Sequence, residues 1–230
     1  MSGLAMDVHV DLTVRVPIQA GYGTSAAGTL ASCLALTDAA GIPTTMNELG
    51  RITHVAEVQN KTGLGTASAL LTGGFVLVTE PGAPGIGSLD HLLFPQGYVV
   101  ICGYLGPIST HNVLAGSNVA GRVNPLARRA LEAIRQKPEL RTFLSEARGF
   151  GKASGFETRG VSHLIEEMMS AGAIGAAQNM IGEAVHAVMT EDKAKRALIK
   201  LRRAFPSCKS FISRLDERGV RLVEPANPKH

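Results

Sequence analysis

Residues 17–28 combine glycines and hydroxyl side chains in an order that could bind phosphate. They read Pro17-Ile-Gln-Ala-Gly-Tyr-Gly-Thr-Ser-Ala-Ala-Gly28. Gly21 and Gly23 permit a backbone with positive φ and a close approach to an anion, and the first-turn amides of a following helix would be free donors. A helix start of this kind attracts phosphate through those amides and through its dipole. Ser25 adds a hydroxyl suited to a phosphate oxygen or to phosphate-bound Mg²⁺.

Three other interpretations of this loop can be weighed from the sequence. A strand-to-helix turn that binds nothing stays open, because glycine turns before helices are common. A dinucleotide-binding fingerprint fits less well: Gly41-Ile-Pro-Thr-Thr45 leads into another helix, where that fold needs a second strand that ends in an acidic residue. A Walker loop is excluded, since no Gly-Lys-Ser/Thr occurs in the sequence.

The loop is expected between a strand and a helix. Residues 7–16 alternate apolar and polar side chains, a pattern typical of a half-buried strand and not of a secretion signal. Helical spacing then runs from Ser25 to Ala40 and stops at Gly41, which puts the loop at the start of that helix.

A second helix, beginning near Thr45 or Asn47, carries the candidate carboxylate Glu57. Its predicted apolar face consists of Leu49, Ile52, Val55 and Ala56. Glu57 and Lys61 lie on the opposite stripe. The residues alone favour one role for Glu57, a partner of Lys61 on an exposed helix face.

The rest of the chain is expected to alternate strands and helices. We predict a short helix over 67–72, strands over 74–79 and 98–104, and helices over most of 124–205, including an apolar stripe from Ala177 to Val188. A last hairpin would pair Ser210–Leu215 with Val220–Val223.

Composition narrows the class of protein. A hydrophobic share of 45%, with 26 glycines and no tryptophan, indicates a soluble globular chain, and the apolar part of residues 16–37 is too interrupted to span a membrane. Three distant cysteines make neither a disulfide framework nor a metal site, which favours a reducing cytoplasm.

The net charge of +4 is uneven, because residues 191–230 hold 11 of the 23 Lys and Arg. We interpret this excess as a solvated helix face and not as a nucleic-acid site, since no aromatic residues are interleaved with it. The basic residues concerned are Lys193, Lys195, Arg196, Lys200, Arg202 and Arg203.

An ordered set of motifs resembles the GHMP kinase superfamily and, within it, the archaeal pantoate kinases. The set comprises the loop at 17–28, His54-Val-Ala-Glu57, Lys61-Thr-Gly-Leu-Gly65, Gly73-Gly74, Pro81-Gly-Ala-Pro-Gly85, Gly106-Pro-Ile-Ser-Thr110, Met180-Ile-Gly182 and Ser213-Arg-Leu-Asp-Glu-Arg-Gly219. The similarity covers nearly the whole chain in the family's order.

The resemblance implies an α/β (α+β) fold of two domains. Residues 1–95 would form the N-terminal GHMP ATP-binding domain, a ribosomal protein S5-like part, and residues 96–230 the C-terminal domain, a ferredoxin-like part. Family members begin with a further strand-rich segment to which nothing in this sequence corresponds, so the first domain is expected to lack its first strands.

The resemblance also implies ATP- and Mg²⁺-dependent phosphorylation of pantoate to 4-phosphopantoate in coenzyme A biosynthesis, in the cytoplasm, without nucleic acid or membrane. A homodimer is a possible assembly. The triphosphate would be held by Pro17, Gly21, Gly23, Thr24, Ser25, Ala26 and Ala27. Ser25 and Glu57 would be the Mg²⁺ ligands, and Gly65, Ser109, Thr110 and His111 would contact the substrate.

One departure from the family concerns catalysis. The family commonly carries Gly-Leu-Gly-Asp, with the aspartate as general base, where this chain has Gly63-Leu-Gly-Thr66. Thr66 is therefore the third candidate catalytic residue, after Ser25 and Glu57, although it cannot accept a proton at neutral pH. The alternatives are a catalytically silent relative with a regulatory or structural role, and a GHMP kinase for another small alcohol such as mevalonate or homoserine.

Overall fold

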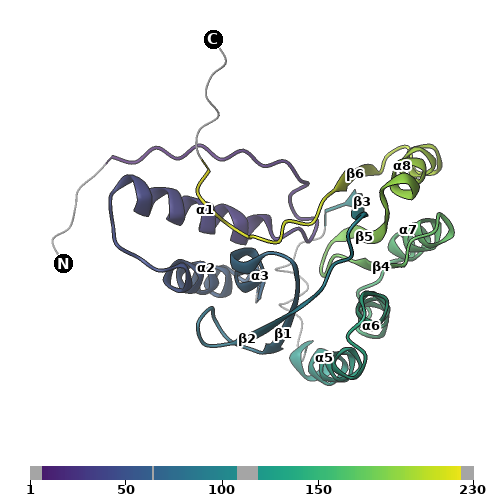
Figure 1. Cartoon of the computed structure of the whole chain (residues 1–230), viewed down its shortest axis with the longest axis horizontal. Coiled ribbons are helices and arrows are strands. Elements are labelled where there is room, and N and C mark those ends of the chain that lie inside the picture. The colour runs from purple at the N-terminus through teal and green to yellow at the C-terminus, as the bar shows by residue number, and fades with distance from the viewer. Residues whose placement is uncertain (1–6, 64, 108–118, 224–230) are drawn as a thin grey trace, which may run out of the picture.

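The computed structural model describes residues 7–63, 65–107 and 119–223. The first elements are α1 (Thr24–Ala39), α2 (Met46–Asn60), α3 (Thr66–Thr72), β1 (Phe75–Glu80) and β2 (Ser88–Leu92). They are followed by β3 (Tyr98–Gly106), α5 (Val119–Gln136), α6 (Leu140–Ala153), α7 (Arg159–Ser170), β4 (Gly175–Gln178), β5 (Glu183–Thr190), α8 (Glu191–Ala204) and β6 (Lys209–Ser213). Helices α1 to α3 lie at one end of the molecule and the larger sheet at the other (Figure 1). The mixed α/β fold predicted from the sequence is confirmed.

The larger sheet has the antiparallel strand order β4-β5-β3-β6. Strand β3 is central and pairs Ile101 with Ala187 of β5 and with Ile212 of β6. With α7 before β4 and α8 before β6, the chain follows the β-α-β-β-α-β order of the ferredoxin-like motif. Strands β1 and β2 form a separate antiparallel pair. The domain boundary at 95/96 stays a prediction.

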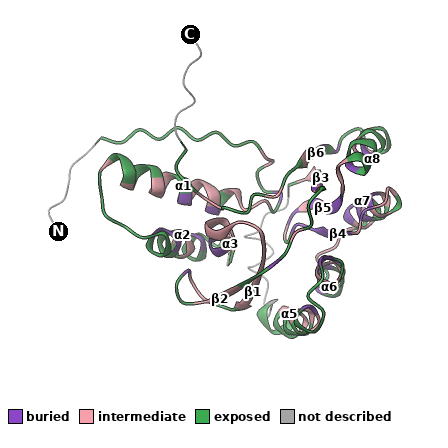
Figure 2. Cartoon of the chain, in the orientation of Figure 1, coloured by how far each residue is buried: buried purple, intermediate pink, exposed green. Residues whose placement is uncertain are grey.

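The main core lies between this sheet and helices α7 and α8. Val99 and Ile101 of β3 face that layer, where Leu164, Ile165 and Met168 of α7 are fully buried. The alternate residues Tyr98 and Val100 face a smaller cluster around Leu144 of α6. This alternation follows from the two-residue period of a strand. Burial is concentrated at the sheet end, as the purple segments of Figure 2 show.

The segment 7–16 is not the half-buried strand that its alternation predicts. It belongs to no strand, and Val8, Val10, Leu12 and Val14 are each about half exposed. A strand needs a neighbouring chain for its backbone N–H and C=O groups, and within the described residues none pairs with this segment. It runs alongside α1 instead (Figure 1), with Leu12 against Gly28.

The stripe from Ala177 to Val188 is not helical either. These residues belong to β4, to the turn after it and to β5. The residues of the two strands are buried or half-buried throughout. A continuous apolar run is the signature of a central strand as well as of a buried helix, and periodicity cannot separate the two.

The predicted C-terminal hairpin is also wrong. Ser210 pairs with Gly103 of β3, so β6 completes the large sheet. Residues 220–223 form no strand.

Several other expectations are confirmed. Helix α1 ends at Ala39, just before Gly41. Helix α2 begins after Thr45, whose hydroxyl accepts a hydrogen bond from the Glu48 amide at 3.2 Å. Elements α3, β1 and β3 lie where they were predicted. Strand β2 was not anticipated. The six basic residues named for α8 are exposed. Across the described parts of the chain, no helix is both long and apolar enough to cross a membrane.

Candidate active site

The glycine loop, residues 17–23, ends at the first turn of α1. Gly21 and Gly23 have φ angles of 72° and 66°, the left-handed conformation that glycine adopts without strain. Gly23 is the N-cap of α1 and has no side chain to occupy the first-turn amides. These amides and the exposed Ser25 hydroxyl are therefore available to an anion, as the sequence predicts.

The glycine loop also lies directly against the start of α3. A Cβ atom on Gly23 would overlap the Cγ2 methyl of Thr66, the first residue of that helix. Glycine at 23 is therefore required twice, once by its φ and once by the space that Thr66 takes.

A chain of hydrogen bonds joins Ser25 to Glu57. The Ser25 hydroxyl donates to the Thr62 hydroxyl at 3.2 Å, and the Thr62 hydroxyl donates to Glu57 Oε1 at 3.0 Å. The backbone of Gly63 lies so close to the same carboxylate that any side chain there would collide with Glu57 Oε2. The turn after α2 thus brings the Glu57 carboxylate to the start of α1.

Glu57 is buried, with only 3% of its surface exposed. This placement excludes the exposed ion pair with Lys61: no ion pair within the described residues involves Glu57, and Lys61 is an exposed left-handed C-cap of α2. The predicted apolar face of α2 was wrong in part, because only Leu49 of its four residues is buried. Ile52 and Val55 are about half exposed, and the buried face is Leu49, Gly50, Thr53 and Glu57.

These donors fit a magnesium ion. Mg²⁺ prefers hard oxygen ligands and is usually held by one or two carboxylates together with substrate phosphates and water. The site offers a buried carboxylate with no cationic partner in the described chain, a hydroxyl from Ser25 and a helix start for phosphate. The described residues contain no group of three or more His, Cys, Asp or Glu side chains that could bind a metal by themselves.

Comparisons with known proteins agree with this geometry. The GHMP kinases N terminal domain matches residues 2–74. Pantoate kinase of Thermococcus kodakarensis is 33% identical over 177 residues, which are 77% of this chain and 58% of that protein. Pantoate kinase of Methanocaldococcus jannaschii is 24% identical over 147 residues, 64% of this chain and 53% of that protein. The chain is therefore similar to the GHMP kinases: its first part matches their N-terminal domain, and most of its length aligns with pantoate kinases.

Solved structures show that the fold of this GHMP kinase homologue is similar to known kinases as well. A protein described as a phosphotransferase related to the CoA biosynthesis pathway superposes with a TM-score of 0.78 at 27% identity, over 89% of this chain and 66% of that one. Homoserine kinase from Cytophaga hutchinsonii gives a TM-score of 0.66 at 16% identity over 90% and 69% of the two chains, which shows a shared fold. The homologue spans a little over half the length of the two curated relatives above.

The structure brings most of the predicted site residues together. Ser25, Glu57 and Thr66 meet around the glycine loop, and Gly65 is the exposed N-cap of α3 beside them. The predicted substrate residues Ser109, Thr110 and His111 lie outside the described residues.

Thr62 is a site residue that sequence reasoning missed. It was quoted within a family motif but given no role, although a hydroxyl five residues after Glu57 in a glycine-rich turn can reach back to that carboxylate. The structure gives it both neighbours, Ser25 and Glu57.

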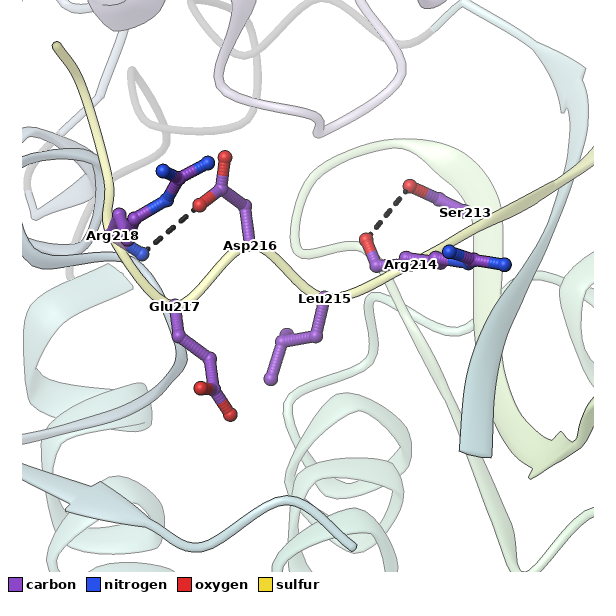
Figure 3. A pocket seen from close by; sticks show the side chains of 6 residues that line it. All are labelled: Ser213, Arg214, Leu215, Asp216, Glu217 and Arg218. Atoms are coloured by element: carbon purple, nitrogen blue, oxygen red, sulfur yellow. Dashed lines mark hydrogen bonds between the residues drawn. The ribbon is translucent and has the colours of Figure 1, made fainter. Parts of the chain in front are cut away.

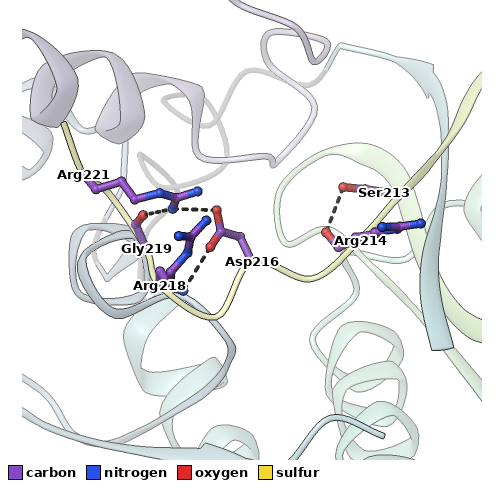
Figure 4. Close-up of polar contacts among 6 residues, drawn as sticks. All are labelled: Ser213, Arg214, Asp216, Arg218, Gly219 and Arg221. Carbon is purple, nitrogen blue, oxygen red and sulfur yellow. Dashed lines mark hydrogen bonds and ion pairs between the residues drawn. The ribbon is translucent and has the colours of Figure 1, made fainter. Parts of the chain in front are cut away.

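A C-terminal strap, residues 214–221, holds the far end of α3. The Gly74 amide donates to the Asp216 carbonyl and the Val220 amide to the Leu70 carbonyl, both at 2.8 Å. The Arg221 guanidinium donates to Asp216 Oδ2 and to the Gly219 carbonyl, each at 2.7 Å. Figure 4 shows both contacts. The Arg218 amide, and after it Arg221, lowers the pKa of Asp216.

An open hollow beside the strap is lined by Ser213 to Arg218 (Figure 3). None of its lining residues is a predicted site residue. The strap connects β6 of the large sheet to α3, the helix that begins with Thr66. Its hollow contains no residue of the glycine loop.

Proposed function

We propose that this GHMP kinase homologue transfers the γ-phosphoryl group of ATP to the hydroxyl of pantoate, giving 4-phosphopantoate for coenzyme A synthesis. The observation that carries the proposal is the buried Glu57 carboxylate, joined through Thr62 to Ser25 at the uncapped start of α1. The choice of pantoate is supported by the two curated relatives and by the CoA-related phosphotransferase.

Each part of the site has a task in this reaction. The residues Pro17, Gly21, Gly23, Thr24, Ala26 and Ala27 would line the triphosphate along the start of α1. The first-turn amides up to Ala26 would be the donors, since Pro17 has no N–H and the Ala27 amide donates to the Gly23 carbonyl at 2.9 Å. Ser25 and Glu57 would hold Mg²⁺, which when bound neutralises phosphate charge. In the transfer, the substrate oxygen bonds to the γ-phosphorus as the bond to the ADP oxygen breaks.

Thr66 shapes the site but cannot take the substrate proton at neutral pH. Phosphoryl transfer through a loose transition state depends mainly on alignment and charge neutralisation, so a base is not essential. The proton would leave to solvent or to a phosphate oxygen. The Thr66 methyl instead fills the space beside the Gly23 backbone.

We propose a cytoplasmic enzyme that needs neither nucleic acid nor membrane, with a homodimer as the assembly to test and a domain boundary near residue 95. Cys33, Cys102 and Cys208 are free thiols, as expected in a reducing compartment. The basic residues of α8 are dispersed over an exposed helix face.

Product formation tests the proposal. The chain is incubated with ATP and Mg²⁺ and with pantoate, homoserine or mevalonate in turn, and products are read by phosphorus NMR. We expect a phosphate monoester from pantoate that is absent in Glu57→Gln. A monoester from another alcohol alone would reassign the substrate, and bound ATP with no product from any alcohol would favour the catalytically silent alternative.

A further inference from the structure

The turn between β4 and β5 lies directly beneath the glycine loop. A Cβ on Gly21 would be 2.8 Å from Cβ of Asn179 and 2.9 Å from the Met180 carbonyl oxygen. A Cβ on Gly182 would overlap the carbonyl carbon of Ala20. Backbones this close leave no room for side chains between them. The turn 179–182 therefore supports the glycine loop by direct backbone packing.

One side chain of the turn bonds to the loop. Nδ2 of Asn179 donates to the Ala20 carbonyl at 3.2 Å, across 159 positions of sequence, and both groups are buried. Ala20 directly precedes the left-handed Gly21. A contact that fixes the Ala20 peptide therefore also fixes the entry to the turn that presents the α1 amides.

His186 of β5 determines which way the Asn179 amide points. Its Nδ1 lies 2.8 Å from Asn179 Oδ1, an oxygen that can only accept, so Nδ1 carries the hydrogen and donates it. Loss of water around the ring lowers the pKa of His186 to about 4, so the imidazole is neutral at physiological pH. With the amide oxygen turned to His186, the NH₂ group is turned to Ala20.

Backbone strain is concentrated around the same loop. Within the described residues, the non-glycine residues with positive φ are Gln19 in the loop, Lys61 just before Thr62, and Ile181 in the supporting turn. A β-branched residue such as isoleucine is a genuine outlier in this region. Strain of this kind persists only where the surroundings hold it, and it clusters at functional sites.

We propose that Asn179, oriented by His186, is a positioning residue for the glycine loop: it holds Ala20 so that Gly21 and Gly23 keep the left-handed form that aims the α1 amides at a nucleoside phosphate. The ligand in this statement rests on the proposed function, whereas the holding of the loop does not. The ring of Tyr22, packed on Phe211 with centroids 5.8 Å apart, is a second anchor of the same loop.

The test uses Asn179→Asp, which keeps the size of the side chain and the acceptor for His186 but turns an acceptor toward the Ala20 carbonyl. Ser154→Ala is the matched control, because it removes a buried hydroxyl that donates to the Gly151 carbonyl at 3.0 Å on α6. Backbone hydrogen exchange is measured without ligand on a peptide covering residues 17–28. We expect exchange to be about tenfold faster in Asn179→Asp and unchanged in the control and in α7 peptides. Unchanged exchange in the loop peptide would overturn the proposal.

Calorimetry with ADP and Mg²⁺ provides the second measurement. Loss of the contact should weaken ADP binding about tenfold, with Ser154→Ala as tight as the parent. A parent that binds ADP and an Asn179→Asp variant that binds it equally well would contradict the positioning role and leave the kinase proposal intact. A parent that binds no ADP would count against the kinase proposal, and the exchange comparison would still decide the positioning.

Variants at His186 cover the case in which Asn179→Asp does not fold. His186→Asn keeps a donor near the position of Nδ1, whereas His186→Leu removes it. We expect loop exchange close to the parent for the first and faster for the second. Equal exchange in both variants would refute the orienting role of His186.

Discussion

Gly23→Ala is the substitution whose cost the structure predicts in most detail. Alanine at φ 66° bears the left-handed strain of about 1–2 kcal/mol. Its Cβ also overlaps the Thr66 methyl, and overpacking of this kind costs about 1–3 kcal/mol. The loop relieves both by leaving its conformation, so nucleotide binding must restore it. Together these effects come to about 3 kcal/mol, or roughly a hundredfold loss of ADP affinity.

Two further variants separate the two contributions. Thr66→Ser removes the overlapping methyl, so Gly23→Ala combined with Thr66→Ser should retain only the strain and lose about tenfold in affinity. Gly41 has a similar φ of 61°, but no atom lies within 4 Å of the place that a Cβ would take. Gly41→Ala should therefore lower the free energy of unfolding without changing ADP affinity.

Calorimetry with ADP and Mg²⁺ and urea unfolding measure the two quantities for each variant. An ADP affinity that is as little affected by Gly23→Ala as by Gly41→Ala would refute the assignment of the glycine loop as the phosphate site. An effect of Gly23→Ala that Thr66→Ser does not reduce would refute the packing argument alone.

The remaining predictions concern the carboxylate, its neighbours and the buried histidine. Glu57→Gln should lower the turnover with pantoate a hundredfold or more, about 2.7 kcal/mol, while Lys61→Ala leaves it unchanged; equal small losses would remove the metal role. Thr62→Val should weaken Mn²⁺ binding to the ADP complex about tenfold, measured by electron paramagnetic resonance, and Thr62→Ser should restore it. Thr66→Asp should be neutral or harmful to turnover if the site works without a general base. A variant that turns over faster than the parent, with a rate that rises with pH through a carboxylate pKa, would show that the parent is weakened by the absence of a base. Because the pKa of His186 is lowered to about 4 in the folded chain, the unfolded chain binds more protons between pH 6.5 and 4, so the free energy of unfolding should fall as the pH falls through that window, and less so in His186→Asn.

The sequence predicts the local features of this site well. The glycines at 21 and 23 and the helix after them were identified from residue types and spacing, because positive φ and free first-turn amides are properties of short segments. The position of Glu57 was harder. Helical periodicity places it beside Lys61 on a polar stripe, and only the packing of α2 against α1 and α3 buries Glu57 while Lys61 stays exposed.

Long-range pairing explains the failures. Residues 7–16 do alternate apolar and polar side chains, but a strand forms only with a partner strand, and the alternation does not say whether one is present. The run around Ala177 to Val188 fits a buried helix and a central strand equally. Asn179 could not be identified as a loop contact, because its partner Ala20 is 159 positions away.

The central claim is that the start of α1 and Glu57 together bind ATP and its metal ion. A crystal structure of the chain with a non-hydrolysable ATP analogue and Mn²⁺, with the metal located by its anomalous scattering, tests it most directly. We predict the triphosphate on the first-turn amides of residues 24–26 and a Mn²⁺ peak within coordination distance of both Ser25 Oγ and the Glu57 carboxylate. A triphosphate bound elsewhere, or a Mn²⁺ peak that Glu57 does not touch, would contradict it.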